Sequence, residues 1–169
     1  MNVSIFVGDI ADAPAEAICT STNPRLSLMM GTGASVREKG GWDVMRACEA
    51  IVATAGGKLR AGSVHATTAG ALKCRTLIHC VASDQSHMTS AHIIQSCVKN
   101  ALACAHRTGC RSIAMPLFGT GHARFKFDQA LMAMRDALQS APASVDEVVI
   151  VVFDPKRAAD AERIIAFRG

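Results

Sequence analysis

Two glycine-rich segments of the sequence have the composition of loops that bind phosphate. They read Gly31-Thr32-Gly33-Ala34 and Phe118-Gly119-Thr120-Gly121-His122, and each stands between an expected strand and an expected helix. Glycine lets the backbone approach a ligand closely, and the N–H groups at a helix start carry partial positive charge that favours a phosphate. Two such loops in one domain would grip both halves of a pyrophosphate. Tight turns between elements are the competing interpretation, and glycine content alone does not separate the two.

The spacing of these glycines differs from that of the commonest nucleotide motifs. Gly31-x-Gly33 and Gly119-x-Gly121 both lack the third glycine of a dinucleotide fingerprint, and neither follows the first expected strand. The chain also contains no Gly-x-x-x-x-Gly-Lys-Ser/Thr loop. A conventional dehydrogenase is therefore a poor candidate.

Histidines and cysteines do not have the spacing of metal ligands. The seven cysteines are odd in number and contain no Cys-x-x-Cys pair, so we expect reduced thiols that act as small core residues. His122 is the only histidine in a candidate loop, where contact with a phosphate or ribose competes with simple exposure to solvent. The other histidines are scattered along the chain, and we expect no metal site.

Composition and charge limit the class of protein. Of the 169 residues, 50% are hydrophobic and 19% are charged, which excludes intrinsic disorder. The net charge of +4 comes without a basic run of three residues, and one Trp with no Tyr offers few platforms for stacking bases, so nucleic acid is not an expected partner. Apolar runs such as residues 148–153 are too short to span a bilayer, and the first residues lack the pattern of a signal peptide. We therefore expect a cytoplasmic protein without membrane contact, and we favour a monomer.

Strands alternate with helices across nearly the whole sequence. We expect strands at residues 3–7, 15–20, 64–68, 76–82, 112–117 and 147–153, and helices at residues 34–39, 43–55, 90–107, about 127–138 and after Asp154-Pro155. Residues 139–144 have the composition of a helix-to-strand connection. The alternation predicts one α/β domain over residues 1–169, a three-layer α/β/α sandwich around a mixed, largely parallel central sheet. Such folds bind ligands at the carboxyl ends of their strands.

Several motifs occur in the order and spacing of a known family. Gly8-Asp9-Ile10 follows the first expected strand, and the second ends in the tetrad Thr20-Ser21-Thr22-Asn23. The glycine loop, a helix that ends in Lys39-Gly40-Gly41, and the segments 60–64, 77–80, 112–121 and 149–154 come next. Over residues 1 to about 167 this order resembles the macrodomain family, whose members bind ADP-ribose. The tetrad departs from the family's Asn-Ala-Ala-Asn-like pattern, because only Asn23 is kept.

This resemblance implies a role for each candidate site residue. Asp9 would accept a hydrogen bond from the adenine amino group, the backbone N–H of Ile10 would meet the ring, and Phe153 would stack on it. Asn23 would orient the hydroxyls of the distal ribose. The diphosphate would lie between two sets of residues, Gly31, Thr32 and Gly33 on one side and Phe118, Gly119, Thr120, Gly121, His122 and Ala123 on the other. Ordinary turn roles for Asp9 and Asn23, and core packing for Phe153, are the alternatives.

One aromatic position of the family is not kept. The family carries an aromatic residue near the distal ribose, where this chain has Ala123. Phe125 and Phe127 are the candidates to replace it. The family implies no cofactor besides ADP-ribose as ligand or product.

The sequence favours a module that binds ADP-ribose or its derivatives, such as mono-ADP-ribosylated protein or O-acetyl-ADP-ribose. A hydrolase or deacetylase is the alternative, with Asn23 as the candidate catalytic residue that would orient water together with a substrate phosphate. In one hydrolytic branch of the family the glycine loop carries a catalytic Asp, and Gly33 stands at that place here. Another branch uses a catalytic Lys, and neither Lys58 nor Lys73 lies in a matching motif. A macrodomain that binds RNA or protein without a nucleotide is the third hypothesis.

Overall fold

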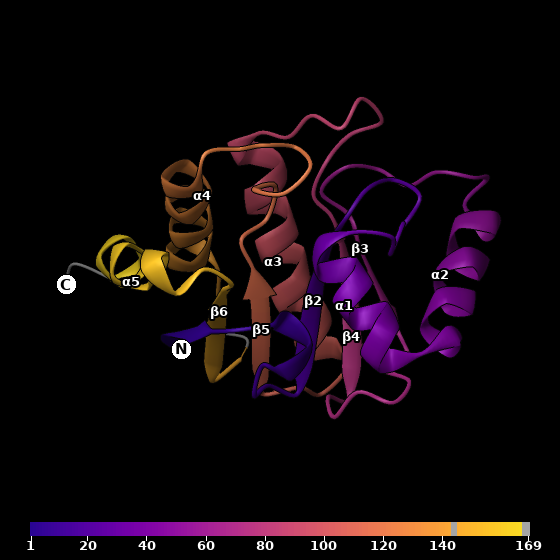
Figure 1. Ribbon diagram of the computed structural model, residues 1–169, viewed down its shortest axis with the longest axis horizontal. Coiled ribbons are helices and arrows are strands. Elements are labelled where there is room, and N and C mark those ends of the chain that lie inside the picture. The colour runs from indigo at the N-terminus through magenta and orange to yellow at the C-terminus, as the bar shows by residue number, and fades with distance from the viewer. Residues whose placement is uncertain (143–144, 167–169) are drawn as a thin grey trace.

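Strands and helices alternate along the chain in the computed structural model, which describes residues 1–142 and 145–166 (Figure 1). The predicted connection at 139–144 and the predicted end of the domain at residue 169 lie partly outside the described residues. The strands are β1 (Asn2–Val7), β2 (Ala17–Thr22), β3 (Val64–Thr67), β4 (Thr76–Val81), β5 (Ser112–Pro116) and β6 (Glu147–Val152). The α-helices are α1 (Gly31–Gly40), α2 (Trp42–Thr54), α3 (Ala91–Arg107), α4 (Phe127–Ser140) and α5 (Ala158–Ile165), and the 3-10 helices are η1 (Ile10–Asp12) and η2 (Pro155–Arg157).

The six strands form one sheet in the order β1-β6-β5-β2-β4-β3. Every neighbouring pair runs parallel except β3 and β4, so the sheet is mixed and largely parallel, as predicted. Strands β2 and β5 are neighbours, and the chain leaves β2 toward α1 on one face of the sheet and β5 toward α4 on the other. Connections that leave neighbouring strands toward opposite faces open a crevice at the carboxyl ends, where α/β folds bind ligands.

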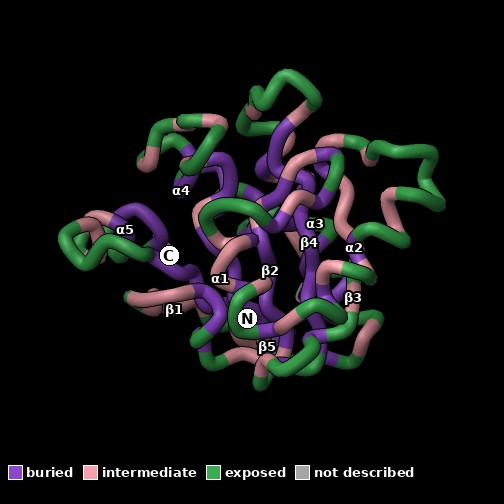
Figure 2. The backbone as a smooth tube through the Cα atoms, turned by 45° about the vertical axis from the view of Figure 1, so that its right-hand side comes forward, coloured by how far each residue is buried: buried purple, intermediate pink, exposed green. Residues whose placement is uncertain are grey.

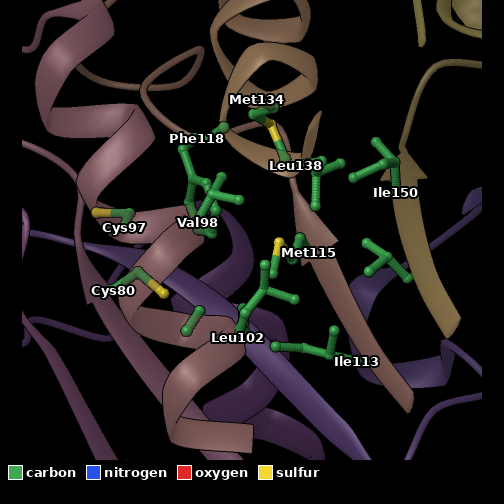
Figure 3. Close-up of a cluster of buried hydrophobic side chains, with 14 of the residues drawn as sticks. Cys80, Cys97, Val98, Leu102, Ile113, Met115, Phe118, Met134, Leu138 and Ile150 are labelled. Atoms are coloured by element: carbon green, nitrogen blue, oxygen red, sulfur yellow. The ribbon is translucent and has the colours of Figure 1, made fainter. Parts of the chain in front are cut away.

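Helices cover both faces of the sheet and complete the predicted α/β/α sandwich (Figure 1). Because successive side chains of a strand point to opposite faces, each buried strand contributes to two cores. Cys19 and Ile78 pack in the core under α3, α4 and α5, whereas Ile18 and Leu77 pack under α1 and α2. Figure 2 shows the buried strands at the centre of the molecule, and Figure 3 shows part of the core under α3 and α4.

All seven cysteines are buried, and none forms a disulfide. They lie on both faces of the sheet and in the helices packed against it, as the prediction of small core residues requires. Burial raises the pKa of Cys97 to about 12 and, with a smaller effect of Glu49, raises the pKa of Cys48 to about 12. Since the thiolate is the reactive form of cysteine, these thiols are poor nucleophiles at neutral pH.

Two helix starts differ from the sequence prediction. Helix α1 begins at Gly31, so the predicted glycine turn forms the first turn of the helix itself. After β6, the Asp154 side chain accepts a hydrogen bond from Lys156 N at 3.0 Å and Pro155 takes the first position, as predicted, but this first turn is η2 and α5 starts only at Ala158. No helix within the described residues is long and apolar enough to cross a bilayer.

Candidate functional site

The carboxyl ends of five neighbouring strands enclose a cavity of about 800 Å³. Its walls come from the segments that follow β1, β6, β5, β2 and β4, with Asp9, Phe153, Leu117, Asn23 and Ser83 among the lining residues. In Figure 1 the loops that leave β2, β4 and β5 gather along the upper side of the view. The cavity therefore lies at the edge of the sheet where the strand order predicts a ligand.

Most of the predicted site residues meet in this cavity. The lining includes Asp9, Ile10, Asn23, Gly31, Thr32, Gly119, Thr120, Gly121, His122, Ala123 and Phe153. Gly33 and Phe118 do not line it. Gly33 is buried inside α1, where an added Cβ would lie 2.9 Å from Leu28 Cα, and Phe118 is a fully buried core residue. Both predictions took a glycine-rich motif as a continuous loop, but the structure places only part of each motif at the surface of the cavity.

The start of α1 supplies backbone donors to one wall of the cavity. Met30 is the N-cap, and the first helical hydrogen bond runs from Ala34 N to Met30 O at 3.3 Å. The N–H groups of the first helical residues therefore have no partner within the helix, which is the usual basis for binding an anion at a helix start. Thr32 Oγ1 accepts a hydrogen bond from Ser21 N at 3.1 Å and so fixes this helix start against β2.

The loop after β5 forms a second glycine-rich wall, and its own hydrogen bonds hold its shape. Thr120 Oγ1 donates to Leu117 O at 3.0 Å, and Phe125 N donates to Gly119 O at 2.9 Å. Gly119 has a φ of +78°, and a Cβ there would lie 2.8 Å from Thr89 Cγ2 in the neighbouring β4–α3 loop. The Thr120 hydroxyl is thus occupied within the loop, and the exposed residues Gly121 and His122 line the cavity beside it.

Replacing Gly119 or Gly121 of this loop by alanine is expected to change the free energy of unfolding by different amounts. Gly119→Ala combines the left-handed φ with the close approach of Thr89, so we expect a loss of about 1–3 kcal/mol in the free energy of unfolding. Gly121→Ala is the matched control, because a Cβ there has no atom within 4 Å and its φ is outside the left-handed region, so we expect a change within about 0.5 kcal/mol. Urea denaturation of both variants measures the difference, and equal stabilities would contradict the role assigned to Gly119.

Asp9 lies at the end of the cavity formed by β1 and β6, and its carboxylate is held by three groups. Oδ1 accepts hydrogen bonds from Ala11 N at 2.9 Å and from the Ser35 hydroxyl, while Oδ2 lies 3.3 Å from Lys39 Nζ. Partial burial raises the pKa of Asp9, but the hydrogen bonds from Ser35, Ala11 and Lys39 outweigh it and leave the pKa below its ordinary value. A carboxylate has about four acceptor positions, so one remains on Oδ2 for a ligand donor.

Phe153 and Asn23 occupy the cavity lining next to different strands. Phe153 follows β6 and is 81% exposed, so it does not pack in the core, and its ring is available to a flat ligand. Asn23 follows β2, where Oδ1 accepts hydrogen bonds from Arg25 N at 3.0 Å and Ser27 N at 3.3 Å. Asn23 therefore does form the turn that its position before Pro24 suggests. Its Nδ2 group has no partner among the described residues and remains available to the cavity.

The cavity lining extends beyond the predicted site residues. Arg157 on η2 lies 3.9 Å from the ring centre of Phe127, and both line the cavity near Phe153. Met29 and Met30, 64% and 63% exposed, stand at the start of α1 without filling the cavity. No family motif covers Arg157, so only its place on η2 in the folded chain reveals it.

The β4–α3 loop contributes a histidine that also lies outside every motif. His87 lines the cavity, and its ring centre lies 4.7 Å from that of His122 at an interplanar angle of 75°. Phe125 instead packs against the core, so of the two candidates to replace an aromatic at position 123 only Phe127 reaches the cavity. Within residues 1–142 and 145–166 no group of three or more metal-ligating side chains comes together.

Comparison with known proteins identifies the fold and the family. The family model described as Macro domain matches residues 19–134. A Macro domain-containing protein of Streptomyces griseus is 33% identical over 174 residues, which cover 98% of this chain and 96% of that protein. The macrodomain of Oceanobacillus iheyensis, solved with ADP, superposes with a TM-score of 0.86 at 22% identity, covering 95% of this chain and 88% of that one. A Trypanosoma brucei macrodomain in complex with ADP-ribose gives a TM-score of 0.80 at 18% identity, covering 97% and 67%. The chain belongs to the macrodomain family.

Proposed function

We propose that this protein binds ADP-ribose, free or attached to a protein or an acyl group, in the cavity at the carboxyl ends of its strands. The observation that carries the proposal is the placement of two amide-rich walls, the start of α1 and the loop of Gly119 to Gly121, around one cavity. A diphosphate between these walls would be bound from both sides by backbone N–H groups.

The order of groups along the cavity supports the same ligand. Asp9 and Phe153 follow β1 and β6 at one end, one amide-rich wall follows β5, and the other follows β2 together with Asn23. A free acceptor position on Asp9 suits an exocyclic amine, and the exposed Phe153 ring suits a purine face. Asn23 Nδ2 would then donate to hydroxyls of the distal ribose. ADP-ribose presents these three parts in this order, and the solved macrodomains above hold ADP and ADP-ribose.

The same geometry favours binding over hydrolysis. The position where a hydrolytic branch would carry an Asp is Gly33, which is buried inside α1 and has backbone within 2.9 Å of an added Cβ. Among the described residues, the carboxylates that line the cavity are Asp9 and Asp154, and both belong to the end near β1 and β6, whereas Asn23 follows β2. Lys39 is paired with Asp9 and Asp12. Among the described lining residues, no carboxylate or lysine lies beside Asn23, so the Asp and the Lys of the two hydrolytic branches have no counterpart there.

Calorimetric titration of the purified protein with ADP-ribose tests the proposal directly. We expect saturable binding near one ligand per chain, with AMP binding more weakly because it lacks the second phosphate and the distal ribose. Absence of heat and of thermal stabilisation at millimolar ADP-ribose would refute the proposal. Incubation with a mono-ADP-ribosylated protein then separates a binding module from a hydrolase. We expect no release of ADP-ribose, whereas release that is lost in a folded Asn23→Ala variant would assign hydrolysis.

A further inference from the structure

Acidic and ionisable side chains are unevenly distributed along the cavity. Among the described residues that line it, both carboxylates, Asp9 and Asp154, lie at the end formed by β1 and β6, together with Arg157. Both imidazoles, His87 and His122, lie on the loops that follow β4 and β5. The half of the cavity that contains the histidines thus has groups that can gain positive charge and no carboxylate in its described lining.

The two histidines come from separate loops that are fixed relative to each other. In the β4–α3 loop, Asp84 Oδ1 accepts hydrogen bonds from Ser86 N at 2.8 Å and Met88 N at 2.9 Å, which closes a tight turn. His87 within this turn has a φ of +60°, a conformation that costs energy for a side-chain-bearing residue. The following Thr89 packs against Gly119 of the β5–α4 loop. The ring contact between His87 and His122 is therefore built by the packing of both loops.

The charged groups around the pair do not already neutralise it. The charged side chains on the same two loops are Asp84, Arg124 and Lys126. Lys58 also contacts the β4–α3 loop, because its Nζ lies 3.4 Å from Gln85 Oε1. Asp84 Oδ1 is bound to the two backbone N–H groups of its own turn. Neither imidazole forms an ion pair with a carboxylate of the described residues. An anionic ligand in the cavity would therefore give a proton on the pair an ion-pair partner that the described side chains do not supply.

We propose that His87 and His122 act as a proton-linked anion clamp, which takes up one proton when a diphosphate ligand binds. His122 directly follows the glycine loop that would hold the phosphates, so a diphosphate brings negative charge next to the pair. Negative charge favours the imidazolium form, and one imidazolium whose edge points at the face of a neutral ring is a favourable contact. Two imidazolium rings with centres 4.7 Å apart would repel each other, so the pair is limited to about one proton.

This inference rests on the proposed function, because it needs a diphosphate in the cavity. Its consequence is that affinity and protonation are reciprocal: if the ligand draws a proton to the pair, lower pH must strengthen binding. Histidine changes charge between about pH 5 and 8, and we expect affinity for ADP-ribose to fall about tenfold from about pH 6 to about pH 8.5. The two phosphates of ADP-ribose each carry one charge and no proton that titrates in this range, so the ligand itself does not produce the effect.

Calorimetry in two buffers of different ionisation enthalpy measures the proton uptake. ADP-ribose is titrated into the full chain near neutral pH, for example in HEPES and in Tris, and the change of observed enthalpy with buffer enthalpy gives the number of protons bound. We expect a value between zero and one for the wild type. His122→Gln and His87→Asn should each reduce it, and the double variant should abolish it together with the pH dependence. Asn is chosen at position 87 because it tolerates the positive φ.

His92→Gln is the matched control, since His92 is an exposed histidine of α3 outside the cavity. It should retain the wild-type proton uptake. ADP-ribose binding with no dependence on buffer in the wild type would overturn the inference, as would an undiminished uptake in the double variant. If ADP-ribose does not bind at any pH, the proposed function itself fails, and this result is distinct from binding without proton uptake.

Discussion

Asp9→Ala is expected to lower the affinity for ADP-ribose by about tenfold to a hundredfold. The carboxylate has one acceptor position left after its bonds to Ala11, Ser35 and Lys39, and that position is the one we assign to the adenine amino group. A hydrogen bond to a charged group contributes about 1.5–3 kcal/mol, and each 1.4 kcal/mol is about tenfold in affinity. Calorimetric titration of the variant measures the loss.

Asp12→Ala is the matched control for this variant. It removes the same charge, and Asp12 lies 2.7 Å from the same Lys39 Nζ, but it does not line the cavity. We expect its affinity for ADP-ribose to remain close to that of the wild type. Because Asp9 also caps η1, Asp9→Ala should lose about 1 kcal/mol of stability, and thermal unfolding shows whether the variant is folded before binding is compared. Equal affinities of the two variants would contradict the role of Asp9.

The order of strands and helices is predictable from the sequence because apolar periodicity and glycine punctuation are local signals. Parallel strands place their carboxyl ends on one edge, so the loops after the strands can be grouped from the sequence alone. The start of α1 is not predictable in this way. Its N-cap is Met30, which makes no side-chain capping bond, whereas the sequence signal for a helix start is Ser, Thr, Asp or Asn at that position. The predicted helix therefore begins three residues late, which wrongly assigns Gly33 to the cavity.

Residues that reach the cavity through tertiary packing have no local signal. His87 belongs to a loop without a motif, and its position depends on the turn closed by Asp84 and on Thr89 packing against Gly119. The sequence predicts that Phe118 lines the cavity, but its side chain packs in the core. A motif next to a phosphate loop does not indicate which of its side chains point into the core. The candidate site is predictable where backbone and strand ends define it and not where side chains from two loops meet.

A buried histidine is expected to make the fold sensitive to acid. His79 on β4 is fully buried between β2 and β3, with Thr20 Oγ1 at 2.9 Å from Nδ1 and Thr67 Oγ1 at 2.8 Å from Nε2. Thr67 Oγ1 also donates its proton to Thr68 O at 3.0 Å, so it must accept from Nε2–H, and Nδ1 is then the acceptor for the Thr20 hydroxyl. Both ring nitrogens are satisfied in the neutral imidazole, and burial, with a smaller effect of His65, lowers the pKa of His79 to about 4.

The direction of the pH effect follows from comparing the two states. Between about pH 4 and the unfolded value of 6.5, the unfolded chain binds a proton at His79 that the folded chain does not, so the free energy of unfolding rises with pH. The stabilisation is fully present above about pH 6.5 and is lost as the pH falls through this window, with a total of about 3 kcal/mol at 1.36 kcal/mol for each unit of pKa difference. Burial also lowers the pKa of His65, which adds to the trend in the same direction.

Urea denaturation at several pH values from about 4.5 to 7.5 measures this dependence, with a slope of up to about 1.4 kcal/mol per pH unit expected in the wild type. His65→Gln should retain most of the slope, since His79 contributes more, and an NMR titration of His79 reports its pKa without any substitution. A free energy of unfolding that stays constant between pH 4.5 and 6.5 would contradict the neutral, buried state of His79. His79 pairs with Thr20 on β2 and does not line the cavity, so its effect is on the fold. Acid should therefore weaken the fold mainly below about pH 6.5, whereas it should strengthen ligand binding at His87 and His122 mainly between about pH 8.5 and 6. Binding and stability therefore have to be measured separately at each pH, and their opposite trends distinguish the two histidine effects.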